Sequence, residues 1–179
     1  MYKGNKVILR EMRSSDMDEV MKYVNDYGVY SSFTDSVPLP KTEEMQKKWL
    51  ANSINPRIIT FAVELIDTGE FIGTCQLRAI DMANGNAYLS IIIGKASVHG
   101  QGYGYDTVKT LLAFAFRELN LHKVSLAVYA NNPGAIRLYE KAGFVREGTL
   151  KQEVYRQGRY CDQFCYSILS REFLGGETQ

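Results

Sequence analysis

The sequence lacks the features of several specialised classes of protein. It has three cysteines in 179 residues, an odd number at wide spacing, which argues against a disulfide framework and fits a reducing cytoplasm. No apolar run approaches the roughly 18 residues that span a bilayer. No apolar signal core follows the first charged residue, Lys3. These absences predict a cytoplasmic protein with no membrane association.

A charge excess of one sign is also missing. Lys and Arg total 21 and Asp and Glu total 20, so the formal net charge is +1 at pH 7. A chain this balanced has no strong field for nucleic acid, and we expect none as a partner. Cys161 and Cys165 would share one face of a strand, but two sulfurs without nearby histidines make a poor metal site. We therefore expect no metal.

The length and the apolar pattern predict one domain of mixed α+β structure. A single domain over 1–174 is the most economical reading, and the polar residues 175–179 are expected to form a disordered tail. Strands are expected at 6–10, 58–65, 70–77, 87–94, 123–130, 144–155 and 160–169, and helices after Ser14 or Ser15, after Thr42, near 103 and after Asn132. This order predicts a mostly antiparallel sheet flanked by helices, with one strand–helix–strand unit at 87–130.

A glycine-rich loop is the most informative segment. Gly100, Gly102 and Gly104 separate the apolar strand at 87–94 from an amphipathic helix with apolar residues three and four positions apart. The unpaired N–H groups at the start of such a helix bind anions, most often phosphates, and glycines let the backbone come close. On this segment alone, a turn that merely links strand and helix is an equally good interpretation.

Two common phosphate-binding loops are excluded. A Walker loop has Lys and then Ser or Thr after its last glycine, where this chain has Tyr105 and Asp106. A dinucleotide fingerprint has G-x-G-x-x-G and an acidic residue at the end of the next strand, where this chain has G-x-G-x-G and Asn131. What remains is a helix start that suits a diphosphate held mainly by backbone amides.

A second motif, NPGAIRLYEKAGF at 132–144, carries a family resemblance. The pattern N-x-x-A-x-x-L-Y-x-x-x-G-F, with the window Q/R-x-x-G-x-G/A at 99–104, resembles the GCN5-related N-acetyltransferases (GNAT). The resemblance covers nearly the whole chain, and KVILREM at 6–12 with the 147–160 ending is most similar to the ribosomal-protein and spermidine acetyltransferase branch. It implies the GNAT fold and direct acetyl transfer from acetyl-CoA to a primary amine.

The resemblance also implies roles for single residues. It places Tyr139 beside the coenzyme sulfur, where a phenol of pKa ~10 is a suitable proton source for a thiolate of pKa ~8.5. Without the motif, Tyr139 would be interpreted as a core tyrosine. The end of the strand before the loop is expected to offer backbone groups to the pantetheine and the thioester oxygen. The expected coenzyme-binding residues are Ile92, Ile93, Gly94, His99, Gly100, Gln101, Gly102, Tyr103, Gly104, Tyr105, Asn132, Arg137 and Lys141.

Several of these roles have alternatives. His99 stands where the family prefers Gln or Arg, and a phosphate neighbour, a surface residue and a proton relay are all open readings. Asn132 suits contact with the pantetheine arm, capping of its helix, or both. Arg137 and Lys141 are cations suited to the coenzyme phosphates or, equally, solvated charges on a helix.

No residue is an obvious general base. Tyr88 and Ala127 occupy places where related enzymes often carry a glutamate, and neither accepts a proton at neutral pH. The carboxylates expected nearest the acceptor are Asp35, Glu64 and Asp81. A water chain through Ser90 is an equal alternative. The two vacant positions also allow a second function, a catalytically silent acyl-CoA-binding or sensor domain.

The amine is expected to bind where the aperiodic segment 27–40 meets the hairpin at 152–162. The residues that favour this place are Tyr30, Phe33, Asp35, Tyr155, Tyr160 and Asp162. Aromatic and acidic side chains suit an amine, but the pattern does not choose between a peptide N-terminus, a polyamine, an amino sugar and an antibiotic. Monomer and homodimer are both open.

Overall fold

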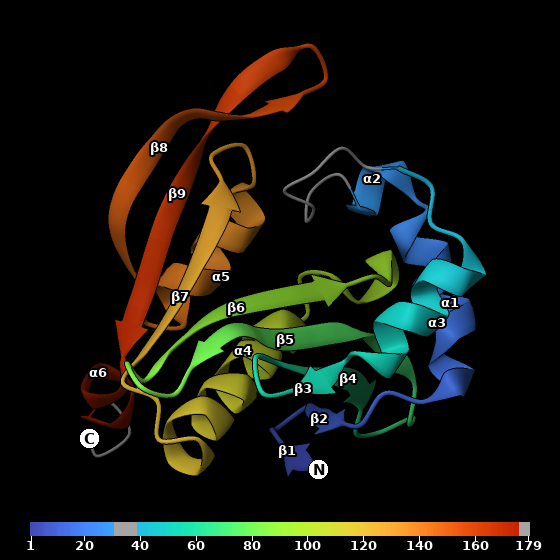
Figure 1. Ribbon diagram of the computed structural model, residues 1–179, viewed down its shortest axis with the longest axis horizontal. Coiled ribbons are helices and arrows are strands. Elements are labelled where there is room, and N and C mark those ends of the chain that lie inside the picture. Colours follow the sequence, from blue (N-terminus) through green and yellow to red (C-terminus); the bar gives the residue numbers. More distant parts are fainter. Residues whose placement is uncertain (31–38, 176–179) are drawn as a thin grey trace.

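The structure is a computed structural model that describes residues 1–30 and 39–175 (Figure 1). Its strands are β1 (Tyr2–Lys3), β2 (Val7–Arg10), β3 (Ile54–Asn55), β4 (Ile58–Leu65), β5 (Phe71–Asp81), β6 (Asn86–Ile93), β7 (Lys123–Tyr129), β8 (Val145–Arg156) and β9 (Arg159–Leu169). Its helices are α1 (Met17–Val24), α2 (Tyr27–Tyr30), α3 (Glu43–Ala51), α4 (Tyr103–Ala113), α5 (Pro133–Lys141) and α6 (Ser170–Gly175). The predicted α+β class is confirmed. Most predicted strands match within one residue at each end, whereas β5 runs four residues further than expected.

The strands form one sheet that divides in its middle. The order is β1-β2-β4-β5-β6-β7-β9-β8, with β3 paired to β4 at the side. The β6–β7 pair is parallel and extends only over 86–88 and 123–125, while the other pairs within the described residues are antiparallel. Beyond Tyr88 and Ser125 the two strands diverge (Figure 1). The divergence leaves one edge of β6 without a strand partner, and this edge positions the site.

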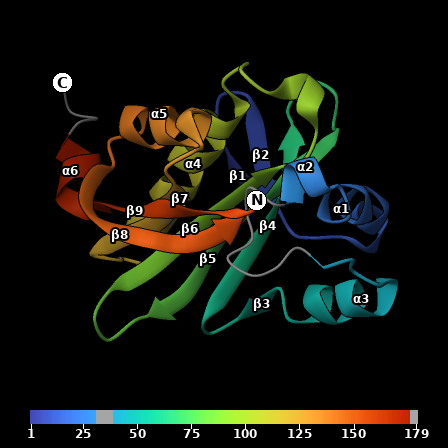
Figure 2. The same ribbon diagram turned by 90° about the horizontal axis from the view of Figure 1, so that it is seen from above.

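Helices cover both faces of the sheet. Helices α4 and α5 lie on one face and α3 on the other, with α1 beside α3 (Figure 2). The apolar face of α4 places Val108, Leu111 and Leu112 in the main core, where each is fully buried. A smaller cluster joins Val20 and Tyr23 of α1 to side chains of β5 and β6. The large core therefore lies under α4, and α1 forms a second, smaller layer.

The helix starts test the predicted caps. Thr42 caps α3 as predicted, since its hydroxyl accepts the Met45 N–H at 3.3 Å. Asn132 caps α5 by accepting the Ala135 N–H at 3.1 Å. The prediction of a Ser14 or Ser15 cap was wrong. Those serines lie within a 3₁₀ turn at 14–16 whose N-cap is Arg13, and the Asp16 carboxylate accepts the Arg13 N–H at 2.8 Å.

Two segments differ from expectation. The start of the predicted loop at 27–40 forms the short helix α2, and residues 31–38 lie outside the described part of the chain. The predicted tail was wrong at Gly175, which ends α6, because Phe173 is buried against Phe116 and holds that helix to the core. Residues 176–179 are not described. Within the described residues, no helix is long and apolar enough to cross a membrane.

Candidate active site

The glycine loop opens α4 as predicted. Gly100 and Gly102 have φ of 77° and 87°, a conformation that non-glycine residues rarely adopt. Gly102 is the N-cap of α4, so the first amides of the helix, at Tyr103, Gly104 and Tyr105, have no acceptor within the helix. These N–H groups and the positive end of the helix dipole suit a diphosphate.

The third glycine has a packing role. A Cβ on Gly104 would come within 2.8 Å of the Leu138 side chain of α5. Its absence lets α4 and α5 approach closely, which brings the two predicted motifs together. Asp106, in the next turn of α4, is buried and accepts backbone N–H groups from Asn5, Lys6 and Val7 at 2.7–3.0 Å. That carboxylate is therefore fully engaged in holding the N-terminal turn against α4.

Side-chain contacts brace the loop from both sides. A ring nitrogen of His99, Nε2, lies 2.8 Å from the carbonyl oxygen of Ile93, to which it donates, so this histidine ties the loop to the end of β6. The Lys6 ammonium donates to the carbonyl of Gln101 at 2.9 Å and lies 5.4 Å from the Tyr103 ring. The sequence reasoning assigned no role to Lys6, because it is nearly a hundred positions from the loop that it contacts.

The free edge of β6 presents backbone groups beside the loop. The Gly94 N–H donates to Ile72 of β5 at 3.0 Å, and hydrogen-bonded pairs alternate along an antiparallel ladder. This alternation turns the N–H and C=O groups of Ile91 and Ile93 to the open edge and those of Ile92 toward β5. The expected backbone contribution therefore comes from Ile91 and Ile93, whereas Ile92 directs its side chain into a cavity described below and Gly94 is engaged by β5.

Tyr139 lies where β6 and β7 separate. It is buried, 8 % exposed, and lines a narrow slot of about 60 Å³ with Ser90, Ile91, Ala127 and Asn132. Its ring packs edge-on against Phe144, 5.8 Å between centroids. Burial raises the pKa of the Tyr139 phenol well above its ordinary value. The phenol carries its proton at physiological pH with or without this shift, and the raised pKa makes it a weaker acid than a free phenol.

Asn132, the N-cap of α5, reaches the slot, whereas Arg137 and Lys141 lie on the exposed surface of the helix. Asn132 caps its helix and also lines the slot, so both predicted roles are compatible with its position. Lys141 is exposed, with its ammonium 4.9 Å from the Tyr105 ring, which places a cation beside the first turn of α4. Arg137 is exposed on the same helix.

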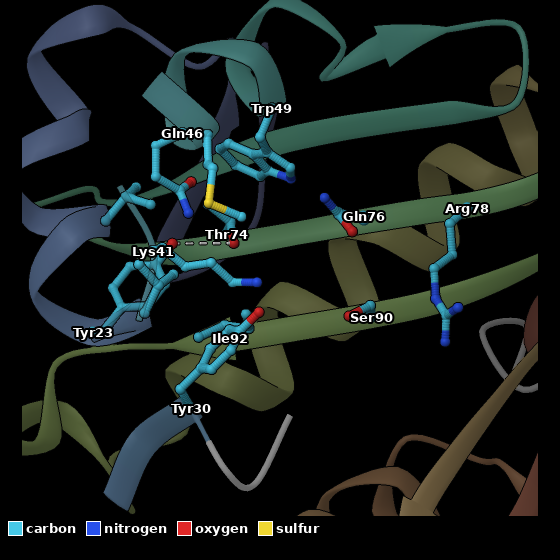
Figure 3. A pocket seen from close by; sticks show the side chains of 13 residues that line it. Tyr23, Tyr30, Lys41, Gln46, Trp49, Thr74, Gln76, Arg78, Ser90 and Ile92 are labelled. Atoms are coloured by element: carbon cyan, nitrogen blue, oxygen red, sulfur yellow. Dashed lines mark hydrogen bonds between the residues drawn. The ribbon is translucent and has the colours of Figure 1, made fainter. Parts of the chain in front are cut away.

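A larger cavity, of about 560 Å³, lies between α1, α2, α3 and the sheet (Figure 3). Its floor is made by Thr74, Gln76 and Arg78 of β5 and by Ser90 and Ile92 of β6. The sequence reasoning missed this floor, although a signal was present. Along β5 these polar residues alternate with Cys75 and Leu77, which are fully buried in the core, as expected for a strand with one polar face.

The cavity and the slot are neighbours. Arg78 and Ser90 line both of them, so a molecule in the cavity borders directly on the Tyr139 slot. The slot and the cavity therefore adjoin at the split of the sheet.

The predicted acceptor region is only partly brought together. Tyr30 lines the larger cavity, whereas Tyr155 and Tyr160 pack on each other at 5.0 Å in the exposed hairpin and line neither the cavity nor the slot. Asp162 accepts the Gln152 N–H and thereby shapes the same hairpin. Phe33 and Asp35 lie outside the described residues. The described acceptor-side cavity is thus formed mainly by helices and β5.

The other described candidates for the general base, Glu64 and Asp81, do not line the slot. Glu64 accepts a hydrogen bond from Arg10, a buried residue that also binds Asp16, and Asp81 accepts two backbone N–H groups of the β5–β6 turn. Tyr88 is exposed, and Ala127 lines the slot without a polar side chain. The described residues that line the slot include no Asp, Glu or His. Nor do the described residues contain a group of three or more His, Cys, Asp or Glu arranged to hold a metal ion.

A mostly antiparallel sheet that divides between two parallel strands, with a glycine loop opening a helix beside the division, defines an acyl-CoA-dependent N-acyltransferase. The chain belongs to the GNAT acetyltransferases, since the family model described as an acetyltransferase (GNAT) domain matches residues 6–145. It is an N-acetyltransferase of that family.

Individual relatives extend over the full domain. The chain is 30 % identical to a spermidine N(1)-acetyltransferase of Vibrio cholerae, covering 96 % of this chain and 97 % of the relative. It is 28 % identical to the uncharacterized N-acetyltransferase p20 of Bacillus licheniformis, covering 95 % and 96 %. A crystal structure of the Vibrio cholerae spermidine N-acetyltransferase in complex with CoA and spermine superposes with a TM-score of 0.86, at 29 % identity, over 94 % of this chain and 98 % of that one.

Proposed function

We propose that the protein transfers an acetyl group directly from acetyl-CoA to a primary amine, with both substrates bound at once. The observation that carries this proposal is the split between β6 and β7. It brings the Tyr139 slot, the start of α4 and the large cavity to one place, so that two ligands can meet without a covalent enzyme intermediate. The acceptor classes open from the sequence are a peptide N-terminus, a polyamine, an amino sugar and an antibiotic, and polyamines are what the named Vibrio cholerae relative acts on.

The residues present fit acetyl-CoA, which supplies the acetyl thioester. The amides of Tyr103, Gly104 and Tyr105 bind its diphosphate, and Lys6 and Lys141 add positive charge near the same loop. The backbone of Ile91 and Ile93 faces the open edge of β6, where an N–H group stabilises charge that develops on the thioester oxygen. Tyr139 donates a proton to the departing sulfur.

Proton removal from the amine falls to solvent. Ser90 is the polar side chain that borders both the cavity and the slot from β6, and its hydroxyl can hold a water between the amine and bulk solvent. We assign the base to such a water, because the described slot residues provide no carboxylate.

The test combines binding and turnover. Calorimetry with coenzyme A is expected to show one site per chain, and thiol release from acetyl-CoA is expected to rise with at least one member of a panel of peptides, polyamines, amino sugars and aminoglycosides. No heat at millimolar coenzyme A would contradict the proposal. The panel decides the acceptor class in the same experiment.

A second function is favoured by the same absence of a carboxylate among the described slot residues. A catalytically silent acyl-CoA sensor needs the glycine loop but no base. It predicts tight coenzyme binding with no thiol release for any amine, and a single turned-over amine excludes it.

A further inference from the structure

The loop between β6 and α4 is closed on itself by two side chains. The His99 ring donates from Nε2 to the carbonyl oxygen of Ile93, 2.8 Å away and six residues earlier. The Gln101 side chain donates to the carbonyl oxygen of Ser97 at 2.8 Å. Both residues are expected near the coenzyme, and in this structure these side-chain groups bind the loop itself. They hold the shape of the segment that leads into the first amides of α4.

The peptide unit between Ile93 and Gly94 is held from three directions. Its carbonyl oxygen accepts the hydrogen bond from His99, and its N–H donates to the carbonyl oxygen of Ile72 on β5 at 3.0 Å. On the side of α1, the buried Tyr23 packs directly on Gly94, where an added Cβ would lie 2.3 Å from the ring. The loop, β5 and α1 together set the position of the end of β6.

His99 reaches the open edge of β6. The alternation of the ladder with β5 turns the carbonyl of Ile93 to the same edge as the N–H groups of Ile91 and Ile93. The histidine ring therefore lies at the end of the edge along which the thioester arm is proposed to bind. The next residue in the chain, Gly100, begins the turn that leads to the diphosphate amides. One residue thus joins the two parts of the proposed coenzyme site.

The middle of the loop is anchored as well. Val98 is buried in the main core, and the backbone N–H of His99 donates to the carbonyl of Ala96 at 3.1 Å, which closes the 3₁₀ turn at 96–98. A short segment that is braced inside and anchored to the core moves as a unit. The position of its end at Gly100 is therefore carried to its end at Ile93, which a flexible link would not achieve.

We propose that His99 is a positioning residue that couples the diphosphate site to the thioester site. This proposal rests on the proposed acetyl transfer and adds a role within it. The first amides of α4 bind the diphosphate, the braced loop carries that position through His99 to the carbonyl of Ile93, and the edge of β6 then meets the thioester in one register. Binding energy from the diphosphate is thereby used to orient the reacting carbonyl, although the diphosphate takes no part in the chemistry.

The test breaks this link in the donor and in the protein. Acetyl-CoA is compared with S-acetylpantetheine, which has the thioester arm but ends before the diphosphate, using an amine identified by the acceptor panel. In the wild type, kcat with acetyl-CoA is expected to exceed kcat with S-acetylpantetheine by ~10-fold or more, because the remote binding energy is used for orientation. His99→Leu is expected to lower kcat with acetyl-CoA by ~10-fold and to leave kcat with S-acetylpantetheine within about twofold.

A rescue variant and a matched control accompany His99→Leu. His99→Gln is expected to restore the ratio between the two donors, because its side-chain amide also carries an N–H donor for the Ile93 carbonyl. His122→Leu makes the same replacement at the other histidine of the chain, an exposed residue just before β7, and is expected to change neither kcat. A merely structural role of His99 would lower kcat with both donors alike, so the split between them is the decisive quantity.

A spectroscopic measurement reads the same coupling without turnover. The carbonyl carbon of acetyl-CoA, labelled with ¹³C, is expected to shift downfield when it binds the wild type, because an N–H group of β6 polarises the carbonyl. The shift is measured at saturation, which calorimetry establishes for each protein. We expect His99→Gln to retain the downfield shift and His99→Leu to reduce it.

The outcomes distinguish the coupling from the proposed transfer. A wild-type ratio near one, an equal loss with both donors in His99→Leu, or no restoration by His99→Gln overturns the role of His99 and leaves the transfer intact. Equal carbon shifts in the three proteins overturn that role as well. The expected carbon shifts without turnover of any amine support the coupling and instead contradict the transfer.

Discussion

The proposed coenzyme side and the proposed acceptor side of the site are built in different ways. The coenzyme side consists of two short segments, the 99–105 loop and α5, and offers mainly backbone N–H groups and helix ends. The acceptor side gathers side chains from α1, α2, α3, β5 and β6 around one cavity. The first side requires glycines at particular positions, and the second requires that distant elements pack in one arrangement.

This difference predicts that the two halves of the site tolerate substitution unequally. Backbone amides at a helix start recognise any diphosphate, so the loop sequence has few alternatives. A side chain such as Gln76 can change without disturbing the sheet, because β5 is held by Cys75 and Leu77 on its opposite face. The five predictions that follow separate the two sides, beginning with the largest effect.

Among these predictions, the substitution of Arg10, which supports the elements around the large cavity, should have the largest effect. Arg10 is 4 % exposed and forms a two-pronged pair with Asp16, both distances 2.8 Å, and a further bond to Glu64, which together join β2, β4 and the start of α1. Arg10→Met leaves the buried Asp16 and the partly buried Glu64 without their ion-pair partner and should cost about 3–5 kcal/mol of unfolding free energy. Urea denaturation measures this loss of unfolding free energy. Arg13→Met, at an exposed arginine, should stay within about 0.5 kcal/mol.

The ion pair between Arg10 and Asp16 also makes the stability of the fold depend on pH. Burial alone would raise the pKa of Asp16, but hydrogen bonds from Arg10 and the Arg13 N–H outweigh it and hold the pKa below its ordinary value. A depressed folded-state pKa contributes stability above the unfolded pKa of ~3.9 and loses it as the pH falls through the folded-state value. Stability should therefore decline below about pH 4, and less steeply in Asp16→Asn. Equal slopes in both proteins would contradict the assignment.

Tyr139 should separate catalysis from coenzyme binding. Tyr139→Phe removes the phenol without removing the ring, so acetyl transfer should slow by ~10²-fold while coenzyme A affinity changes little. Steady-state rates and calorimetry measure the two quantities. Tyr166→Phe is the matched control, because Tyr166 is also buried but donates to Glu140 away from the slot. An unchanged rate in Tyr139→Phe would remove this residue from the mechanism.

The glycine loop should respond in coenzyme affinity alone. Gly102→Ala forces a Cβ into a backbone of φ 87° and should weaken coenzyme A binding by ~10-fold, since the cost of about 1 kcal/mol falls on the loop that holds the diphosphate. Gly148→Ala, where nothing lies within 4 Å of an added Cβ, is the control. Equal affinities for the two variants would show that the loop does not set the coenzyme contact.

Lys6 should give the smallest effect. Lys6→Gln removes a charge beside Gln101 and Tyr103, and coenzyme A affinity should fall by about threefold, with a weaker dependence on salt than in the wild type. Lys3→Gln, three residues earlier on β1, removes the same charge without a contact to the loop. Titrations at low and high ionic strength test both.

Features that depend on residues close together in the chain were predicted, and contacts between distant segments were not. The period-2 and period-3.6 patterns predicted most strands and helices, because those patterns report which side of each element faces the core. Asn132 and Thr42 were predicted as caps, since a cap is a contact over three residues. The Ser14 or Ser15 cap was wrong because both serines lie within a 3₁₀ turn, whose last residue, Asp16, binds Arg10 of β2.

The sequence by itself determined the family, the coenzyme loop and the candidate acid Tyr139, because each depends on residues close together in the chain. Only the tertiary structure placed Lys6 against the loop, paired Glu64 with Arg10, and assembled Lys41, Gln76 and Arg78 around one cavity. Those contacts join segments tens of residues apart, and their geometry depends on how α1 and α3 pack on the divided sheet. Local patterns carry no record of that packing, so the described lining of the large cavity emerged only with the fold.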